Sequence, residues 1–504
     1  MDKTLSYYQK RENRRRLERF SEYRSIGFSM GADALLGAAL LVFSFDLKTR
    51  SFSGAMLAVA ALYLVMAGCL ALLQRKMQSD ILKTNDIRQG TRLAGIPMLL
   101  TIAAGNLFAA LAGFQLLKKE KSVEYTLCSY MVIVQLLVIL VSSLNVFKDY
   151  VTNSFFLGIG LMSGLLVFYV LALILVGRFT TGQAVDKKMI ILAVPLILSS
   201  LSGNLFALLV GIILISRAAN REPDVSVEWV EVIKRLCRNQ MALLGCFIVI
   251  FLISISVCSN LTFDYDFAVS NNYSALLQPP SLKYPFGTDD FGRCVFTRVV
   301  FGARISLLVG ILSTALSIIV GVVLGALAGY YSNAVDNGIM RVLDIFQAIP
   351  GLLLPIAIIT AFGTSIPNII LALGVGVIPG YARTARATVM TLTGSEFVEA
   401  AKACGVKESQ IIFRHILPNS LAPIIVRATM SIGSATLAVS ALSYLGLGID
   451  SHIPEWGNIL RTGSTYLETN PYLAIYPGLA IILLVLAFNF LGDGLRDAMD
   501  PKLK

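Results

Sequence analysis

The chain has 504 residues, of which 56% are hydrophobic and 14% are charged. Soluble globular proteins carry about 25% charged residues, so this composition excludes that class. Apolar stretches of about 18 residues or more recur and are long enough to cross a bilayer as helices, which predicts an all-α polytopic membrane protein. The net charge of +11 lies largely beside apolar runs, where orientation signals belong, and no nucleic-acid recognition module is visible.

Cysteine and histidine usage argues against a metal site, a disulfide framework or a redox motif. The seven cysteines show no C-x-x-C spacing, and most lie in or beside apolar runs, where Cys acts as a small hydrophobe. Only His415 and His452 occur, so neither a histidine-based metal site nor a directly bound cofactor is expected. Residues 1–25 are rich in Arg and Lys and are predicted to stay in the cytosol, where they can also touch membrane lipid.

Six apolar runs follow and form a predicted membrane domain over residues 26–216. They lie near residues 27–45, 52–74, 94–117, 125–147, 154–177 and 189–215. IPMLLTIAAGNLFAALAGFQLL (96–117) and VPLILSSLSGNLFALLVGIILI (194–215) align without gaps, which indicates a duplication with copies near 27–118 and 125–216. Three spans per copy is an odd number, so the second copy is predicted to be inverted relative to the first.

The loop charges of this domain agree only partly with that topology. Basic residues suit a cytosolic loop after the second run, namely Arg75, Lys76, Lys83, Arg88 and Arg92. Three lysines after the third run would then face outward, against the positive-inside rule: Lys118, Lys119 and Lys121.

Inverted repeats are typical of secondary transporters, so one hypothesis is a self-contained twelve-span carrier. Almost no ionisable residue is found inside the first six spans, where a coupling ion would need a ligand. Asn106 and Asn204 are the best polar candidates. An intramembrane Asn more often bonds a neighbouring helix, and we favour that interpretation.

A polar, charged segment over residues 217–240 is the predicted cytosolic linker to a second membrane domain, 241–504. Six further spans are expected near residues 241–258, 305–331, 339–362, 367–390, 421–447 and 472–491. The total is then about twelve spans with both termini cytosolic. Asp344 and Gln347, on one of these spans, either border a translocation path or are packing polar groups, and the sequence does not choose.

The long segment 259–303 is predicted to lie outside the membrane. Asp289, Asp290 and Arg293 suggest a catalytic or metal site there, but no His or third acid converges with them in sequence. We therefore favour a structural loop.

The loop over residues 394–419 carries too much charge to cross a bilayer. Phe397, Ala400, Ala401 and Cys404 recur at helical spacing and would let a partner surface approach closely. Gly405 is expected to end this helix, and a second short helix ends at Pro418. The pattern predicts two short helices joined by an elbow on the membrane surface.

These residues resemble the EAA loop of ABC-importer permeases, through Glu399-Ala400-Ala401, Gly405 and Ile416-Leu417-Pro418. The resemblance covers roughly residues 228–504 and is to the second permease subunit of dipeptide and oligopeptide importers. It includes FGTDDFGRCVFTRVVFGARISLLVG (286–310), GYARTARA (380–387), LSYLGLGI (442–449), PEWGNIL (454–460) and FNFLGDGLRDAMDPKLK (488–504). Cys294 departs from the pattern, because an acid is usual there.

The resemblance implies a six-span type I permease that forms half of a translocation path in a prokaryotic-type cell membrane. Partners would be a second homologous permease, two cytosolic ATP-binding subunits and an extracytoplasmic substrate-binding protein. The ATPase-coupling residues would be Phe397, Glu399, Ala400, Ala401, Lys402, Gly405 and Arg414. The sequence has no G-x-x-x-x-G-K-[ST] motif, so no ATPase or other enzyme activity of its own is expected. Peptides are the expected solute class, with nickel or another small solute as the alternative, and residues 1–220 match no recognised family.

Overall fold

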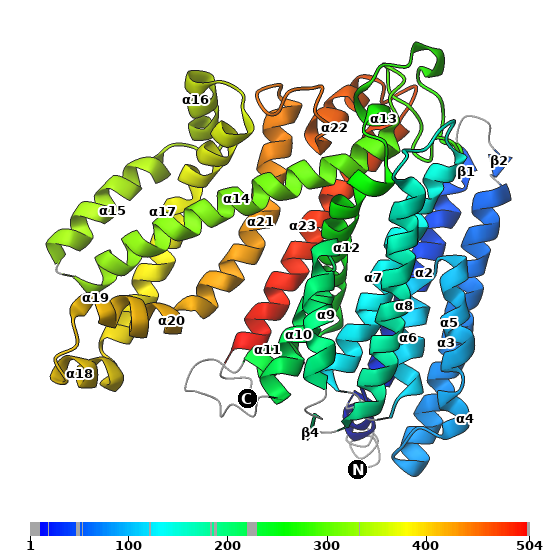
Figure 1. Ribbon diagram of the computed structural model, residues 1–504, viewed down its shortest axis with the longest axis horizontal. Helices are drawn as coiled ribbons and strands as arrows, with labels where there is room; N and C mark the ends of the chain where they lie inside the picture. The colour runs from blue at the N-terminus through cyan, green and yellow to red at the C-terminus, as the bar shows by residue number, and fades with distance from the viewer. Residues whose placement is uncertain are drawn as a thin grey trace, which may run out of the picture. The chain divides into compact units, whose positions relative to one another are not determined.

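The computed structural model describes residues 11–18, 20–46, 51–52, 54–119, 122–181, 184–185, 189–218, 229–331 and 333–500. The predicted linker residues 219–228 and the first ten residues of the basic segment lie outside this set. The protein is a nearly all-helical polytopic membrane protein, as the sequence predicts (Figure 1). Two hairpins of two-residue strands are the described exceptions: β1 (Phe45–Asp46) with β2 (Ser51–Phe52), and β3 (Thr180–Thr181) with β4 (Ala184–Val185).

The chain divides into two compact units. Unit 1 comprises residues 1–133 and 169–192, and unit 2 comprises residues 134–168 and 193–504. Parts of the predicted extra domain therefore pack with the second half of the chain. The helices of unit 1 are α2 (Ser21–Phe43), α3 (Gly54–Thr84), α4 (Gln89–Arg92), α5 (Gly95–Leu100), η1 (Thr101–Ala104), α6 (Leu107–Leu117), the start of α7 (Val123–Ser143) and the end of α8 (Phe155–Phe179).

Unit 2 holds the remaining elements. Before the linker these are η2 (Leu144–Phe147), most of α9 (Ile190–Ser199), η4 (Ser200–Ser202) and α10 (Leu205–Ala218). After it come α11 (Trp229–Leu236), α12 (Gln240–Thr262), α13 (Asp266–Val269), η5 (Tyr273–Ala275), α14 (Val295–Tyr330), α15 (Asn333–Ala348), α16 (Leu353–Phe362), α17 (Ile366–Thr393), α18 (Glu396–Ala403), α19 (Glu408–Gln410), η6 (Ile411–Ile416), α20 (Leu417–Asn419), α21 (Leu421–Tyr444), α22 (Trp456–Thr465) and α23 (Tyr472–Met499).

The structure does not confirm the predicted number of twelve membrane spans. Among the described residues, nine helices are long and apolar enough to cross a membrane, or ten if α15 and α16 form one broken span. Those two helices are bent by 88°. The break contains Pro350 and Gly351, and proline removes a backbone hydrogen bond from a helix.

The missing spans are the two duplicated runs, because each one breaks into a pair of short helices. In the first copy the break lies at Gly105, whose φ is +77°, and in the second at Gly203, whose φ is +86°. Glycine adopts this left-handed conformation readily, and it commonly ends a helix. An asparagine follows each glycine; the side chain of Asn106 accepts a hydrogen bond from the backbone of Ala109 and starts α6.

Both broken runs fold back on themselves. In unit 1, Gly95 at the start of α5 lies against the backbone of Gly113 in α6. In unit 2, Gly211 of α10 lies against Ala193 and Ile197 of α9. Each run is therefore a hairpin of two short helices in place of one span.

A hairpin returns the chain to the side from which it came. Each copy then contributes two long apolar helices and one hairpin. The inverted arrangement predicted from the sequence counted each hairpin as a span, and it stays a prediction.

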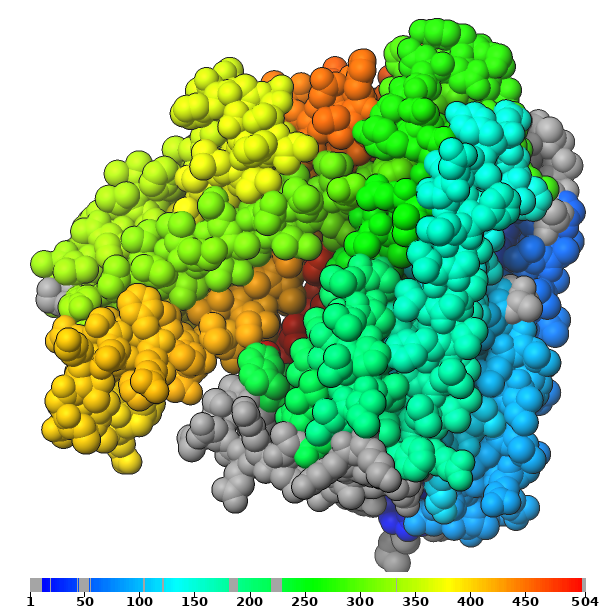
Figure 2. All heavy atoms as spheres, viewed as in Figure 1, coloured from blue at the N-terminus to red at the C-terminus, as the bar shows by residue number. Residues whose placement is uncertain are grey.

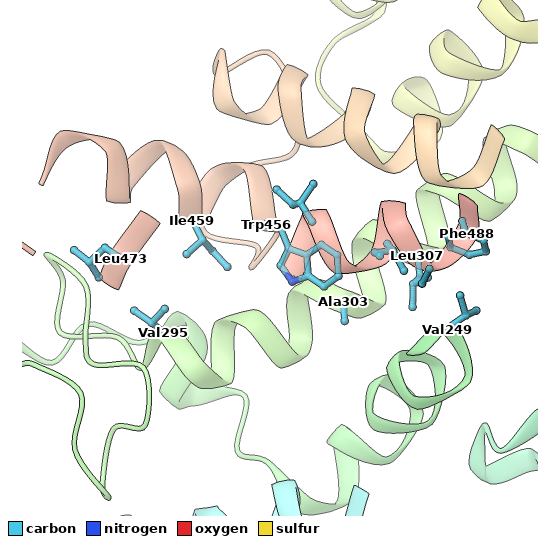
Figure 3. Packing of buried hydrophobic residues seen from close by; sticks show 11 residues of the cluster. Val249, Val295, Ala303, Leu307, Trp456, Ile459, Leu473 and Phe488 are labelled. Atoms are coloured by element: carbon cyan, nitrogen blue, oxygen red, sulfur yellow. The ribbon is translucent and has the colours of Figure 1, made fainter. Parts of the chain in front are cut away.

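The largest described core of unit 2 brings together α12, α14, α22 and α23. Trp456 is fully buried and packs with α12, α14 and α23 (Figure 3). Its indole nitrogen donates to the carbonyl oxygen of Val299 at 2.9 Å. Glu455 is also fully buried, and its carboxylate accepts hydrogen bonds from Ser306, from Ser440 and from the first backbone amides of α22. Both oxygen atoms of the buried Glu455 carboxylate therefore accept hydrogen bonds.

Candidate coupling site

The loop over residues 394–419 forms two short helical segments joined by an elbow, as predicted. Helix α18 ends where the amide of Gly405 donates to the carbonyl of Lys402 at 3.0 Å and that of Val406 to Ala401 at 3.1 Å. This pair of bonds satisfies the last carbonyls of a helix when the residue between them is left-handed. Gly405 has a φ of +72°, so the predicted elbow residue has the required conformation. In the space-filling view the loop forms a lobe that projects from unit 2 (Figure 2).

One face of the loop is anchored to the membrane helices of unit 2. Val398 is fully buried and packs with three isoleucines of the second segment and with residues of α14 and α17. The isoleucines are Ile411, Ile412 and Ile416, and the residues beneath them are Ala326 and Val389. A force on the loop is therefore transmitted to α14 and α17 through packed side chains.

The opposite face of α18 is open. Phe397 is 39% exposed, and Glu399, Ala400 and Cys404 are also exposed. On the second segment Phe413 is 53% exposed and Arg414 is exposed beside it. Two large apolar side chains therefore stand on this charged, projecting surface.

Two predicted coupling residues lie differently from the rest. Ala401 is half-buried and packs inward with the Val398 cluster, so only part of the predicted stripe faces outward. The ammonium group of Lys402 lies 5.4 Å from the centre of the Tyr330 ring on α14. Such a cation–π contact holds α18 against α14 from the side.

The predicted path residues lie on α15. Asp344 forms an ion pair of 2.6 Å with Arg383 of α17, and both side chains are about half-exposed. Gln347 is exposed. A second pair, Asp336 with Arg386, joins the same two helices nearer to the loop. These contacts tie α15 to α17, and among the described residues no hydrogen bond engages the side chain of Gln347.

A cavity of about 760 Å³ lies between α17, α21 and α23. Its lining includes Thr384, Arg427 and Arg496. Arg427 donates a hydrogen bond of 3.3 Å to the hydroxyl of Thr384. Since α21 begins directly after the loop, this cavity is adjacent to the coupling segment in the chain. No spacing pattern in the sequence predicts that these three helices assemble around a cavity.

The segment over residues 259–303 is held by an internal ion pair. Asp289 is buried, and one of its oxygens accepts the side-chain hydrogen bond of Arg293 at 2.8 Å. Its other oxygen accepts from the backbone amides of Phe291 and Arg293. Among the described residues no group of three or more His, Cys, Asp or Glu side chains could hold a metal ion. The three hydrogen bonds to the carboxylate of Asp289 hold the turn at residues 289–293.

Asp33 is an ionisable residue that the sequence reasoning missed inside the first six runs. It lies in the middle of α2 and is fully buried. Asn106, one of the two polar candidates, donates from its side-chain amide to Asp33 at 2.7 Å. The favoured interpretation of Asn106, a bond to a neighbouring helix, is thus confirmed. The sequence feature that could have revealed this site is Asp33 itself, because it is an acidic residue within the apolar run 27–45.

Comparisons with known proteins match the second half of the chain. The family model described as "N-terminal TM domain of oligopeptide transport permease C" matches residues 228–280. The model described as "Binding-protein-dependent transport system inner membrane component" matches residues 321–504. The chain is also similar to a solved structure titled as the MetNI methionine ABC transporter in inward facing conformations, at 19% identity and a TM-score of 0.34, over 40% of this chain and 97% of that one. That score is too low to compare the folds.

Two curated relatives are similar over the same share of the chain. A dipeptide transport system permease protein of Alkalihalophilus pseudofirmus is 45% identical over 276 residues, which is 55% of this chain and 90% of the relative. A glutathione transport system permease protein of Pectobacterium atrosepticum is 40% identical over 284 residues, which is 56% of this chain and 94% of the relative.

Proposed function

Because the chain belongs to the family of binding-protein-dependent transport system inner membrane components, we propose that residues 241–504 form one permease subunit of an ATP-driven importer. Peptide-class solutes are the proposed cargo, since the similar relatives are named for dipeptide and glutathione transport. The single observation that carries the mechanism is the loop at 394–419, buried on one face and open on the other.

In the proposed mechanism a cytosolic ATPase subunit binds the open face of α18. Phe397 enters a groove of that subunit, and Glu399 and Arg414 lie at the rim of the contact. When ATP binding closes the ATPase pair, the loop moves with it. The movement reaches the pore helices through Val398, which packs on α14 and α17. The permease itself supplies no phosphate-binding motif, so the energy arrives by contact.

We propose that the working assembly contains a second homologous permease, two ATP-binding subunits and an extracytoplasmic substrate-binding protein. Helix α15 supports a permease–permease contact, because its apolar side chains Val342 and Ile345 are 53% and 66% exposed. Both termini and the loop at 394–419 lie in the cytosol in this proposal, and Asp344 and Gln347 border the translocation path. The chain resides in a prokaryotic-type cell membrane.

Residues 26–216 are proposed to be an added membrane domain, joined through residues 217–240. Part of it supports the permease in unit 2. Asn145 donates from its side-chain amide to the carbonyl of Thr262 at 2.9 Å, and Lys148 donates to the hydroxyl of Thr297 at 2.6 Å. Both donors are buried. These contacts tie the turn between α7 and α8 to the end of α12 and the start of α14, which favours a scaffold role.

The test is reconstitution of the full chain with its second permease and ATPase subunits in proteoliposomes. ATP-dependent uptake of a labelled dipeptide is measured for wild type and for Ala400→Glu, which adds a bulky acid on the open face of α18. His452→Glu is the matched control, because the His452 side chain is 87% exposed on a loop outside this face. We expect Ala400→Glu to lose uptake and ATPase co-purification, and His452→Glu to keep both. Equal uptake in the two variants at equal membrane levels would contradict the docking role.

A further inference from the structure

The carboxyl group of Asp33 lies deep in unit 1. Its side chain is fully buried, and α2, which carries it, runs from Ser21 to Phe43, so that Asp33 is near the middle of a span. The hairpin α5–α6 brings its tip to the same depth, because ten helical residues rise by about 15 Å, half of a hydrocarbon core of about 30 Å. The tip is Gly105-Asn106, and Asn106 contacts Asp33 directly.

Hydrogen bonds fix the orientation of the Asn106 amide. Its oxygen accepts from the backbone amide of Ala109 at 3.0 Å and begins α6, so its nitrogen must face the other way. That nitrogen donates to the Oδ2 atom of Asp33 at 2.7 Å. A second contact holds the hairpin against α2 one turn away, where the hydroxyl of Ser29 donates to the carbonyl of Phe108 at 2.8 Å. The tip of the hairpin is thus docked on α2 at two points.

The other oxygen of the Asp33 carboxyl has no partner. Its Oδ1 atom is buried and accepts no hydrogen bond from the part of the chain that the structure describes. The hydroxyl of Tyr63, which reaches the tip of the hairpin, donates to the carbonyl of Gly105 at 3.2 Å. In the same described set no Lys, Arg or His forms an ion pair with Asp33. An ionised carboxylate here would be a bare charge within hydrocarbon, which costs several kcal/mol.

A metal cation would relieve this charge only if several oxygen atoms converged on it, since hard cations take about six or more oxygen ligands. One free oxygen is present, and the amide group that faces Asp33 is a donor, which repels a cation. A proton needs only one oxygen. We propose that Asp33 is an intramembrane proton-binding site, with the proton on Oδ1, Oδ2 held by Asn106, and the α5–α6 hairpin docked on the neutral acid.

The proposal does not depend on the transport reaction of the second half. It gives the added domain an activity of its own, because release of the proton leaves a charge that the docked hairpin cannot solvate. The hairpin must then open to water, so proton binding and hairpin docking are coupled. The duplicated copy offers no equivalent acid at the matching position, since residue 131 is Met131.

The test is infrared difference spectroscopy on the full chain in lipid nanodiscs at neutral pH, in H₂O and D₂O. A protonated carboxyl gives a C=O stretching band that shifts on deuteration. We expect this band in wild type and its loss in Asp33→Asn, an isostere of the neutral acid. Glu18→Gln, which removes an exposed acid of the same unit, should keep the band. Absence of the band in wild type, or its persistence in Asp33→Asn, would overturn the assignment.

A second variant assigns the proton to one oxygen and guards against misfolding of the first. Asn106→Ser keeps a helix-capping hydroxyl but removes the amide donor to Oδ2. We expect the band to remain and to move to higher frequency, because a C=O group that loses a hydrogen bond stiffens. An unmoved band would contradict the geometry. Spectra in sodium chloride and in choline chloride should be the same. A carboxylate band that appears only in sodium chloride would show that Asp33 binds a cation, and it would contradict the proposed proton site.

Discussion

The conformation of Gly405 predicts a measurable energetic cost for any side chain at the elbow. Its φ is +72°, and nothing lies within 4 Å of the position that a Cβ atom would take. A substitution to alanine therefore meets no steric neighbour, and its cost comes from the backbone alone. An L-residue in the left-handed region costs about 1–2 kcal/mol relative to glycine.

This cost falls on the elbow rather than on the fold as a whole. The elbow is exposed, so the chain can relieve the strain by rotating Gly405 out of the left-handed region. That rotation breaks the two bonds that end α18 and reorients its open face. A penalty of about 1–2 kcal/mol lowers the equilibrium constant for the dockable form by about 5- to 30-fold. We expect Gly405→Ala to weaken ATPase binding by up to this factor and to reduce uptake accordingly.

The assay is titration of purified ATPase subunits onto the permease in nanodiscs, with uptake in proteoliposomes as a second readout. Gly394→Ala is the matched control, because Gly394 lies at the start of the same loop, has a φ of −86°, and also has open space around it. It should bind ATPase as wild type does. If Gly405→Ala also binds as wild type does, the elbow does not need its left-handed residue and the reasoning fails.

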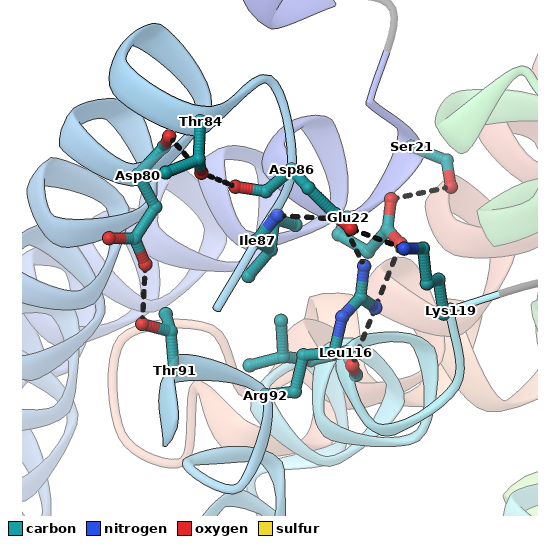
Figure 4. A network of polar contacts seen from close by, with 10 residues as sticks. All are labelled: Ser21, Glu22, Asp80, Thr84, Asp86, Ile87, Thr91, Arg92, Leu116 and Lys119. Atoms are coloured by element: carbon teal, nitrogen blue, oxygen red, sulfur yellow. Dashed lines mark hydrogen bonds and ion pairs between the residues drawn. The ribbon is translucent and has the colours of Figure 1, made fainter. Parts of the chain in front are cut away.

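Three further outcomes follow from burial and charge. Val398→Ala should destabilise the loop by about 2 kcal/mol, seen as faster amide hydrogen exchange in α18, whereas Phe397→Ala should leave exchange unchanged and weaken ATPase binding. The hydrogen bond from Lys119 holds the pKa of Asp86 below its ordinary value (Figure 4). This pair therefore stabilises unit 1 at neutral pH, and that contribution to the stability is lost as the pH falls through the lowered pKa of Asp86. The melting temperature of Asp86→Asn should show less of that acid dependence. Burial lowers the pKa of Lys148. Between this lowered pKa and about 10.5 the unfolded chain binds more protons than the folded chain, so the folded state becomes more stable as the pH rises. The melting temperature of Lys148→Met should lose this rise with alkaline pH.

The coupling loop could be predicted from the sequence in most respects. The charged residues of this loop predicted that it does not span the membrane, and Gly405 predicted the elbow. The helical spacing predicted the stripe of Phe397, Ala400 and Cys404, which is exposed in the structure. The spacing did not reveal that Ala401 turns inward, because two apolar faces meet on this helix. Val398 defines the inner face, and only the positions of α14 and α17 decide which face is buried.

The two hairpins could not be predicted from hydropathy, because an apolar run of more than 20 residues looks the same whether it crosses the membrane once or folds back at its centre. The local signal was the pair Gly-Asn at 105–106 and again at 203–204. Glycine favours the end of one helix and asparagine the start of the next, so together they mark a break. The role of Asp33 was missed for a related reason: its partner Asn106 comes into reach only when the third run, 94–117, folds back.

The hairpins also remove the one conflict between the loop charges and the topology. With a full span at 94–117, the lysines at 118, 119 and 121 faced outward, against the positive-inside rule. A hairpin returns the chain to the side from which it came, so in the proposed orientation Lys118 and Lys119 lie on the cytosolic side, as the charge rule requires. If α15 and α16 count as one broken span, the ten candidate spans of the described residues are an even number. Ten spans and two hairpins therefore agree with the proposal that both termini lie in the cytosol.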